Sequence, residues 1–333
     1  MQLKIIAEIA QAHDGSLGIA HSYIDALAAC GVNAVKFQTH IAEAESSEFE
    51  SFRVNFSYED KTRFDYWKRM EFTLEQWRSL KKHCDEVGVE FISSPFSCAG
   101  VDLLEEVGVK RYKIGSGEMT NFLMLAKIAR IGKPIILSSG MSDYKELDEC
   151  IAFLKPFGNE LSLLQCTTSY PTQPEQWGLK EIPKMKERYG IPIGYSDHSS
   201  DITACIAATA LGAEILEFHA VFDKNMFGPD AKASLNLDEI KQLVHSVRNL
   251  EKAMKQNTNK TDVSSYEGLK ILFGKSLAVN KNLNQGHVIT LDDLESKKPG
   301  NCGIPAKDFN LLLGKKLKKP LTKWDFVKVE DVE

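Results

Sequence analysis

Residues 191–219, IPIGYSDHSSDITACIAATALGAEILEFH, contain one complete strand–helix–strand unit. Ile191–Ser196 and Glu214–His219 are short apolar runs of the kind that form buried strands. Asp201–Leu211, which lies between them, has the longer pattern of a helix and begins with a capping residue. Gly212 follows at a position where glycine commonly ends a helix. The stretch therefore predicts two parallel strands joined by a helix.

The same alternation of strand and helix patterns extends over residues 4–256. The six further apolar runs are Ile5–Ile9, Ala34–Thr39, Val89–Pro95, Arg111–Gly115, Pro134–Ser139 and Leu161–Thr167. Candidate helices include Ile19–Cys30, Leu74–Val87, Val101–Val107 and Ser142–Leu154, and Gly31, Gly88, Gly108 and Gly132 mark helix ends. Eight such units in about 250 residues predict an α/β fold, a closed (β/α)8 TIM barrel. An open doubly wound sheet is the alternative, but it does not normally place polar residues at every strand end.

The pattern changes after residue 256. A polar run without a core pattern, Gln256–Asp262, begins a linker that we assign to residues 257–274. Residues 275–333 show short alternating strands, Gly and Pro turns and many lysines, which indicates a small β-rich domain. The sequence thus predicts a catalytic barrel over residues 1–256, a linker, and a small C-terminal domain.

Composition narrows the class of function. Acidic residues outnumber basic ones by 46 to 41, so no basic excess indicates binding to nucleic acid or anionic lipid. The chain enters its first strand without an apolar leader, and no run is long enough to span a bilayer. The seven cysteines lack CxxC spacing and are expected to be reduced core thiols. These features favour a cytoplasmic protein.

Polar residues follow every predicted strand. They are Glu8, Lys36 with Gln38, Ser93 with Ser94, Lys113 with Ser116, Ser138 with Ser139, Thr168 with Tyr170, Ser196 to His198, and Glu217 with His219. A single serine at such a point is more often a helix cap or turn than a ligand. In a barrel, however, all strands end at one rim, where the reacting groups of barrel enzymes lie. The convergence therefore predicts an active site.

Two lysines within predicted strands indicate an anionic substrate. Lys36 and Lys113 lie inside apolar runs, where a buried lysine is costly unless it meets an anion. Hydroxyl groups of Ser94, Ser116 and Ser138 would complete a cradle for phosphate and carboxylate. Phosphoenolpyruvate fits this description. A Schiff base on a lysine, as in class I aldolases, remains the alternative mechanism.

Two histidines on the last two strands are candidate metal ligands. His198 and His219 would be adjacent in a closed barrel, with Glu8, Asp197 and Glu217 nearby on the rim. Mixed nitrogen and oxygen ligands would suit Mn²⁺ and do not distinguish it from Mg²⁺, Co²⁺ or Zn²⁺. His13 and His40 are weaker candidates.

Several motifs, in their order along the chain, resemble those of the sialic acid synthases. They are Ala7–Ile9, His13–Gly15, Val35–Thr39, Ser93–Phe96, Tyr112–Glu118, Cys166–Thr172, Ser196–Ser199 and Gly228–Asp230. The tail resembles the antifreeze-like (SAF) domain of that family through Lys298-Pro299-Gly300. The resemblance covers nearly the whole chain. It implies a transferase that condenses phosphoenolpyruvate with N-acetylmannosamine or a 2,4-diacetamido-2,4,6-trideoxyhexose by C–O cleavage.

The resemblance also assigns roles to residues. It implies that phosphoenolpyruvate is held by Lys36, Gln38, Ser94, Lys113, Ser116, Ser138 and Ser196. It implies that His198 and His219 bind a divalent metal, usually Mn²⁺, that Glu8, Glu217 and His219 serve the reacting centre, and that Tyr170 and Asp230 contact the sugar. Lastly, it implies a domain-swapped homodimer, in which the small domain of one chain covers the barrel mouth of the other.

Departures from the family pattern bear on the acceptor. Lys298 stands where the family often has Arg, and lysine cannot make the same bidentate contact with the sugar. A related synthase that uses a sugar phosphate would need another basic cluster, and we expect none beyond Lys36 and Lys113. A barrel that has lost catalysis and only binds carbohydrate or a partner is disfavoured by the retained lysines and histidines.

Overall fold

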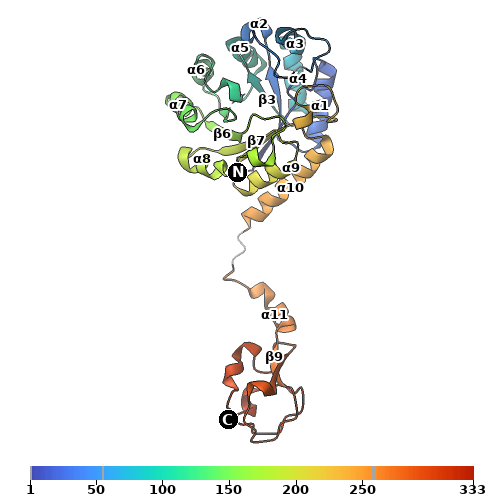
Figure 1. Ribbon diagram of the computed structural model, residues 1–333, viewed down its shortest axis with the longest axis vertical. Helices are drawn as coiled ribbons and strands as arrows, with labels where there is room; N and C mark the ends of the chain where they lie inside the picture. Colours follow the sequence, from blue (N-terminus) through green and yellow to red (C-terminus); the bar gives the residue numbers. More distant parts are fainter. Residues whose placement is uncertain (1, 55, 257–259) are drawn as a thin grey trace. The chain divides into compact units, whose positions relative to one another are not determined.

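The structure, a computed structural model, describes residues 2–54, 56–256 and 260–333. The chain divides into two units, Met1–Gln256 and Asn257–Glu333 (Figure 1). Within the linker predicted at residues 257–274, residues 257–259 lie outside the described residues. The remainder of that segment includes a short helix, α11 (Glu267–Phe273).

The N-terminal unit is built on a sheet of eight parallel strands. They are β1 (Lys4–Glu8), β2 (Ala34–Thr39), β3 (Glu90–Pro95), β4 (Tyr112–Lys113), β5 (Ile135–Ser138), β6 (Leu161–Cys166), β7 (Ile193–Asp197) and β8 (Ile215–His219). Their order is β3-β2-β1-β8-β7-β6-β5-β4, so the first strand pairs with both the second and the last. β3 and β4 are neighbours at the seam, although no ladder joins them in the described residues. This nearly closed barrel confirms the predicted fold and excludes the open doubly wound sheet.

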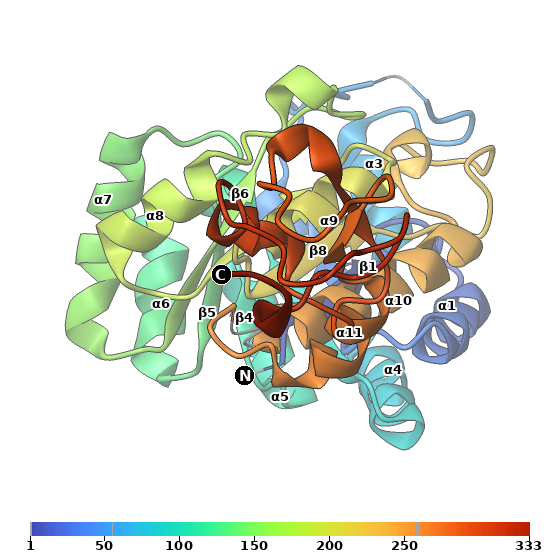
Figure 2. The same cartoon turned by 90° about the horizontal axis from the view of Figure 1, so that it is seen from below.

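Helices surround the strands (Figures 1 and 2). They are α1 (Leu17–Ala29), α2 (Ala42–Glu45), α3 (Arg63–Met70), α4 (Leu74–Val87), α5 (Cys98–Val107), α6 (Phe122–Ile131), α7 (Tyr144–Leu154), α8 (Glu181–Tyr189), α9 (Ile202–Ala210) and α10 (Leu237–Lys255). The predicted helix ends at Gly31, Gly88, Gly108, Gly132 and Gly212 are confirmed by a positive φ at each. The β2–α4 connection, which contains α2 and α3, was not predicted to hold helices.

Strand alternation explains where the polar residues lie. Ile6, Ala34, Ile92, Ile136, Leu164 and Ile215 form a separate buried cluster on six strands. Because side chains alternate between faces, residues two positions further along a strand share the same face. Glu8 therefore follows Ile6, Lys36 follows Ala34, and Glu217 follows Ile215 on the inside of the barrel. An apolar layer thus supports a polar layer at the carboxyl ends of the strands.

The C-terminal unit has its own small core. β9 (Ser276–Val279) pairs antiparallel with β10 (Leu294–Lys297). The core residues of this unit are Leu277, Val279, Leu283, Ile289, Ile304, Leu312, Leu317, Leu321 and Val327. In contrast, α11 and the residues before it expose apolar side chains, among them Tyr266, Leu272 and Phe273. This small β-rich unit agrees with the predicted C-terminal fold.

The cysteines agree with a further expectation. All seven cysteines are free thiols, as predicted, and most of them are buried. Among the residues that the structure describes, no helix combines the length and apolar character needed to cross a membrane.

Candidate active site

A cavity of about 530 Å³ opens at the carboxyl ends of the barrel strands. The predicted site residues of the barrel all line it: Glu8, Lys36, Gln38, Ser94, Lys113, Ser116, Ser138, Tyr170, Ser196, His198, Glu217, His219 and Asp230. The structure therefore brings these residues together from eight strands and their loops. Lys298 belongs to the C-terminal unit, where its ammonium lies 5.1 Å from the ring centre of Phe273.

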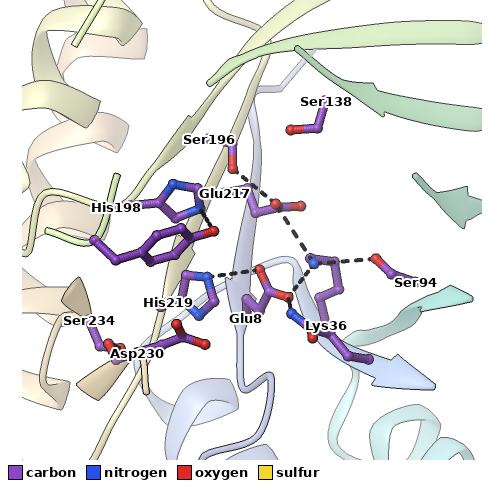
Figure 3. A network of polar contacts seen from close by, with 12 residues as sticks. Glu8, Lys36, Ser94, Ser138, Ser196, His198, Glu217, His219, Asp230 and Ser234 are labelled. Carbon is purple, nitrogen blue, oxygen red and sulfur yellow. Dashed lines mark hydrogen bonds and ion pairs between the residues drawn. The ribbon is translucent and has the colours of Figure 1, made fainter. Parts of the chain in front are cut away.

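Two lysines and two glutamates form a buried ionic network in the cavity, and Figure 3 shows Lys36 between Glu8 and Glu217. Lys36 Nζ donates to Glu8 Oε1 at 2.5 Å and lies 3.8 Å from Glu217 Oε1. Lys113 Nζ lies 3.3 Å from the same oxygen of Glu217. The anions that satisfy the buried lysines are thus carboxylates of the protein itself. Burial of the lysines alone, as argued from the sequence, is therefore not sufficient to indicate an anionic substrate.

The network fixes the charge of its members. Burial alone would raise the pKa of Glu8, but Lys36, His219 and Lys113 hold it well below its usual range. Burial would lower the pKa of Lys36, but Glu217 and Glu8 raise it. Both side chains stay ionised at neutral pH, so Glu8 is a weak base and Lys36 a weak nucleophile.

Glu217 differs from Glu8 because one of its carboxylate oxygens has no hydrogen-bond partner among the described residues. Its Oε1 accepts a hydrogen bond from Ser196 Oγ at 3.1 Å, in addition to its contacts with the lysines. Its Oε2 is buried and has no hydrogen-bond partner among the described residues. A buried carboxylate oxygen without a partner is costly, so this atom is a natural acceptor for a proton donor in the cavity.

Hydroxyl groups from neighbouring strands form a second polar cluster. Ser116 Oγ, just after β4, donates to Ser138 Oγ at 3.1 Å and accepts from the backbone N–H of Gly140 at 3.1 Å. A Cβ atom on Gly140 would collide with the side chains of Ser116 and Thr168, so the loop after β5 requires glycine here. Ser94 Oγ lies 3.5 Å from Lys36 Nζ. These donors suit the oxygens of a phosphate or carboxylate group.

His198 and His219 lie next to each other, with ring centres 5.3 Å apart. His198 Nδ1 donates to the Thr167 carbonyl at 3.0 Å, and Nε2 lies 3.2 Å from the Tyr170 hydroxyl. His219 Nε2 lies 3.4 Å from Glu8 Oε2. Burial lowers the pKa of His219. Burial also acts to lower the pKa of His198, but Cys166 and Thr167 raise it to about 9.

The donor set can be tested against the metal expected from the sequence. Across residues 2–54, 56–256 and 260–333, no group of three or more His, Cys, Asp or Glu is arranged to hold a metal ion. The histidine pair offers two nitrogen ligands. The Thr167 carbonyl accepts a hydrogen bond from His198, and a carbonyl or carboxylate commonly orients a metal-binding histidine in this way. The residues fit an open site, in which substrate and water would supply the other ligands, and not a closed structural site.

Tyr170 and Asp230 are joined by a residue that the sequence did not indicate. Tyr170 stacks on His198 with ring centres 4.2 Å apart. The guanidinium of Arg53 lies 4.2 Å from the centre of the Tyr170 ring, and its Nη2 donates to Asp230 Oδ1 at 2.8 Å. Arg53 therefore connects the β2–α4 loop with the loop that follows β8.

The expectation that no basic cluster lies beyond Lys36 and Lys113 is wrong. Arg53 and Arg63, both from the β2–α4 connection, line the same cavity. Further lining residues not singled out as site residues include Gln11, Glu45, Glu50, Trp67, Phe96, Glu118 and Met141. His40, a weaker candidate, is stacked between Trp67 and Phe96, with ring centres 3.7 and 4.5 Å away. These residues lie in loops or in short helices such as α2 and α3, and which of their side chains reach the cavity is decided by tertiary packing and not by a sequence pattern.

Comparison with known proteins gives a consistent family. Residues 23–259 match the NeuB family and residues 274–333 match the SAF domain. The chain is 36% identical over 317 residues to N,N'-diacetyllegionaminic acid synthase of Campylobacter jejuni, covering 93% of this chain and 94% of that protein. It is 35% identical over 319 residues to N-acetylneuraminate-9-phosphate synthase of Homo sapiens, covering 94% and 88%.

A solved structure extends the likeness to three dimensions. The N-acetylneuraminic acid synthetase of Leptospira borgpetersenii, determined in complex with citrate, superposes with a TM-score of 0.72 at 30% identity. The alignment covers 81% of this chain and 91% of that one. The match of family, sequence and fold extends over the barrel and its cavity. The chain is therefore an enzyme of the NeuB family, with a SAF domain over residues 274–333.

Proposed function

We propose that this enzyme condenses phosphoenolpyruvate with the aldehyde form of an N-acylated hexosamine, which gives a nonulosonic (sialic-type) acid and inorganic phosphate. The relatives named above are synthases of such acids. The observation that carries the proposal is the buried network of Lys36, Lys113, Glu8 and Glu217 beside the histidine pair. It combines groups for an anionic substrate with groups for acid–base chemistry in one cavity.

Phosphoenolpyruvate would occupy the part of the cavity near the lysines and serines. Lys36, Lys113, Ser116 and Ser138 offer donors for its phosphate and carboxylate oxygens. The formal charges of the two lysines and two glutamates cancel, so the lysines alone do not offset an added anion. Further positive charge is needed.

We propose that a divalent metal, with Mn²⁺ as the first choice, supplies that charge at His198 and His219. Bound there, it would act as a Lewis acid on the aldehyde oxygen of the acceptor. Mg²⁺ and Co²⁺ are the alternatives to test. The protein's own part is to present two imidazole nitrogens, one of them oriented by the Thr167 carbonyl.

The chemistry requires one new carbon–carbon bond and one broken carbon–oxygen bond. C3 of phosphoenolpyruvate attacks the aldehyde carbon, whose oxygen takes up a proton and becomes a hydroxyl group. Water adds at C2, where positive charge has developed, and gives up a proton. The hydroxyl group on C2 then gives up its proton and becomes the C2 ketone as the bond between C2 and the phosphate ester oxygen breaks, and phosphate leaves with that oxygen and takes up the proton. Lys36 and Lys113 would hold the departing phosphate oxygens.

The two glutamates are suited to different roles. Both carboxylate oxygens of Glu8 have polar contacts. Lys36 and Gln38 donate hydrogen bonds to Oε1, and His219 Nε2 lies 3.4 Å from Oε2. Its lowered pKa also makes it a poor base. We therefore assign orientation and charge balance to Glu8. We assign water positioning and proton acceptance to Glu217, whose Oε2 is free of hydrogen bonds in the part described.

A Schiff-base aldolase is less well supported. A lysine that attacks a carbonyl must be deprotonated, and activation normally requires a lowered pKa. The pKa of Lys36 is instead raised by Glu217 and Glu8, after burial has acted in the opposite direction. Lys113 is also paired with Glu217.

We also propose a domain-swapped homodimer in the cytoplasm. A dimer is supported by several exposed apolar side chains that lie close together in sequence, because exposed apolar surface commonly marks an interface. They are Val263, Tyr266, Leu269, Ile271, Leu272 and Phe273. The seven free cysteines support a reducing compartment. Contact between Lys298 and the sugar belongs to the same proposal.

The test is phosphate release from phosphoenolpyruvate by the whole chain. N-acetylmannosamine and 2,4-diacetamido-2,4,6-trideoxyhexoses would be offered separately, with Mn²⁺ and with a chelator. We expect chelator-sensitive release that depends on one of these acceptors. Trapping of pyruvate on the enzyme by borohydride, with turnover that persists in chelator, would instead support the Schiff-base aldolase.

A further inference from the structure

The part of the cavity wall formed by the β2–α4 connection carries two arginines. Arg53 lies over Tyr170 and is hydrogen-bonded to Asp230. Arg63, the first residue of α3, lies over Trp67, with its guanidinium carbon 4.2 Å from the ring centre. Both line the cavity that contains the ionic network. We call this pair of residues the arginine pair.

Arg63 has donor capacity that the protein does not use. Its Nε is buried and has no hydrogen-bond partner among the described residues. The nearest carboxylate oxygen, Glu50 Oε1, is 3.6 Å from Nε, which is beyond a good hydrogen bond. Glu50 is held elsewhere, because the indole Nε1 of Trp67 donates to both of its oxygens at 3.2 and 3.1 Å. A buried guanidinium without acceptors is costly, so an acceptor from a ligand would relieve it.

The two guanidinium groups act on each other. Burial lowers the pKa of Arg63, and the positive charge of Arg53 contributes to the same shift, against Glu50 and Asp230. Asp230 and Glu50 offset part of the repulsion between the two guanidinium groups, and an anionic group of a ligand beside them would offset it further. Arginine suits phosphate and carboxylate because its planar fork can donate two parallel hydrogen bonds. The pair therefore favours an anionic group with several acceptor oxygens.

The position of the pair relates it to the acceptor and not to phosphoenolpyruvate. The Tyr170 ring stacks on His198, with ring centres 4.2 Å apart, and the guanidinium carbon of Arg53 lies 4.2 Å from the centre of the same ring. A sugar whose aldehyde lies at His198 and His219 would thus extend past Tyr170 toward Arg53. The group nearest to the pair would be at the end of the sugar farthest from the aldehyde.

We propose that Arg53 and Arg63 bind a phosphate ester at that far end of the acceptor, so that the enzyme prefers a hexosamine phosphate to the free sugar. This inference rests on the proposed condensation for its chemistry, but the binding site can be tested without turnover. Asp230 lies 2.8 Å from Arg53 and Glu50 lies 3.6 Å from Arg63, so the formal charges balance. Donors nevertheless stay unused, because Asp230 engages only Nη2 of Arg53 and Nε of Arg63 has no hydrogen-bond partner among the described residues. The basic cluster needed for a sugar phosphate is therefore present.

The experiment compares N-acetylmannosamine with its 6-phosphate, using the whole chain, phosphoenolpyruvate and Mn²⁺. The variants are Arg63→Met and Arg53→Met, which keep an apolar stem on Trp67 and Tyr170. Arg78→Met is the matched control, because Arg78 is exposed on α4 and pairs only loosely with Glu106 at 3.6 Å. We expect wild type to use the phosphate with at least about 10-fold higher kcat/KM. Arg63→Met should lose about 10- to 100-fold with the phosphate and clearly less with the free sugar. Arg53→Met also loses its contacts with Asp230 and Tyr170, so activity should fall with both sugars, and fall further with the phosphate.

Calorimetric binding of the 6-phosphate to wild type and Arg63→Met separates this inference from the proposed reaction. If neither sugar is turned over but the phosphate binds wild type and not the variant, the arginine site stands and the proposed reaction fails. Three results would overturn the inference. They are a preference of wild type for the free sugar, equal losses with both sugars in the variants, and equal binding of the phosphate to wild type and Arg63→Met.

Discussion

Glu8 and Glu217 are both buried and both pair with lysines, yet their oxygens are used differently. Glu8 has neighbours on both oxygens, whereas Glu217 Oε2 has no hydrogen-bond partner in the described part of the chain. A carboxylate that orients other groups and a carboxylate that accepts a proton respond differently to replacement by an amide. An isosteric change at each position can therefore separate the two roles.

We expect Glu217→Gln to lower kcat by about 10²- to 10⁴-fold, because an amide cannot accept the proton from water. The KM for phosphoenolpyruvate should change little, since the amide keeps a polar partner for Ser196 and Lys113. Steady-state phosphate release measures both quantities. Circular dichroism checks that the variant is folded.

Glu8→Gln should behave differently, because it removes a charge from the hydrogen bond with Lys36. We expect a higher KM together with a lower melting temperature, as a buried charge loses part of its compensation. Glu214→Gln is the control, since Glu214 lies at the opposite end of β8 and pairs with exposed Lys186. Unchanged kcat in Glu217→Gln would transfer the role of proton acceptor away from Glu217.

At the scale of elements, the strands were predictable because they combine a short apolar run, a glycine stop before it and a polar end. Period-two alternation then brought Lys36, Ser94 and Glu217 to one rim without any knowledge of contacts. The cavity wall from the β2–α4 connection was not predictable. Arg53 and Arg63 reach the cavity through an irregular loop and a short helix, and only tertiary packing decides where such segments lie.

Gly194 is the position where β7 can be tested most directly. A Cβ atom there would lie 2.5 Å from the Ile215 carbonyl oxygen and 2.5 Å from Leu164 Cδ2, which are parts of the neighbouring strands. We expect Gly194→Ala to destabilise the barrel by about 1–3 kcal/mol through overpacking. Gly18→Ala, at an exposed position of α1 with only Ser16 Oγ at 4.0 Å, should instead be neutral or stabilising by up to about 1 kcal/mol. Urea unfolding followed by circular dichroism measures both, and equal midpoints would refute the steric argument.

Asp293 anchors the turn that leads into β10. Burial would raise its pKa, but hydrogen bonds from Lys281, His287 and Thr290 hold it well below its usual range. A lowered pKa means that the carboxylate stabilises the fold above the unfolded pKa of about 3.9. That stabilisation is lost as the pH falls through the folded value.

We therefore expect Asp293→Asn to destabilise β9 and β10 by about 1–3 kcal/mol at pH 7, because charged hydrogen bonds are lost. The difference from wild type should shrink as the pH falls below about 3.9. Hydrogen exchange of the β9 and β10 amides, compared between variant and wild type at each pH, measures this. The exposed neighbour Asp292 supplies the control Asp292→Asn. A difference that grows toward low pH would contradict the assignment.

At the scale of the whole molecule, the two units differ in how well each buries its apolar residues. The barrel has a large continuous core of its own, and the C-terminal unit has a small one of nine buried residues. The segment between residues 263 and 273 nevertheless exposes Leu269, Leu272 and Phe273. An exposed apolar surface of this kind is expected to be covered in the functional assembly, and the proposed dimer would cover it.

A chain cut after residue 260 tests whether the C-terminal unit completes the active site. We expect the barrel of residues 1–260 to fold, because its core lies entirely within the first unit. Its phosphate release should fall by at least about 10²-fold, since a site open to water weakens electrostatic catalysis. Size-exclusion chromatography should show the cut chain as a monomer and the whole chain as a dimer. Full activity of the cut chain would refute a capping role.

Complementation decides which chain the C-terminal unit serves. The cut chain keeps an intact barrel, and the whole-chain variant Glu217→Gln keeps an intact C-terminal unit on an impaired barrel. If the unit of one chain covers the barrel of the other, co-expression of the two should restore phosphate release above that of either alone. If the unit covers its own barrel, neither partner can repair the other, and the mixture should remain as inactive as its components. Restoration would therefore establish the swapped arrangement independently of any effect of the cut on folding.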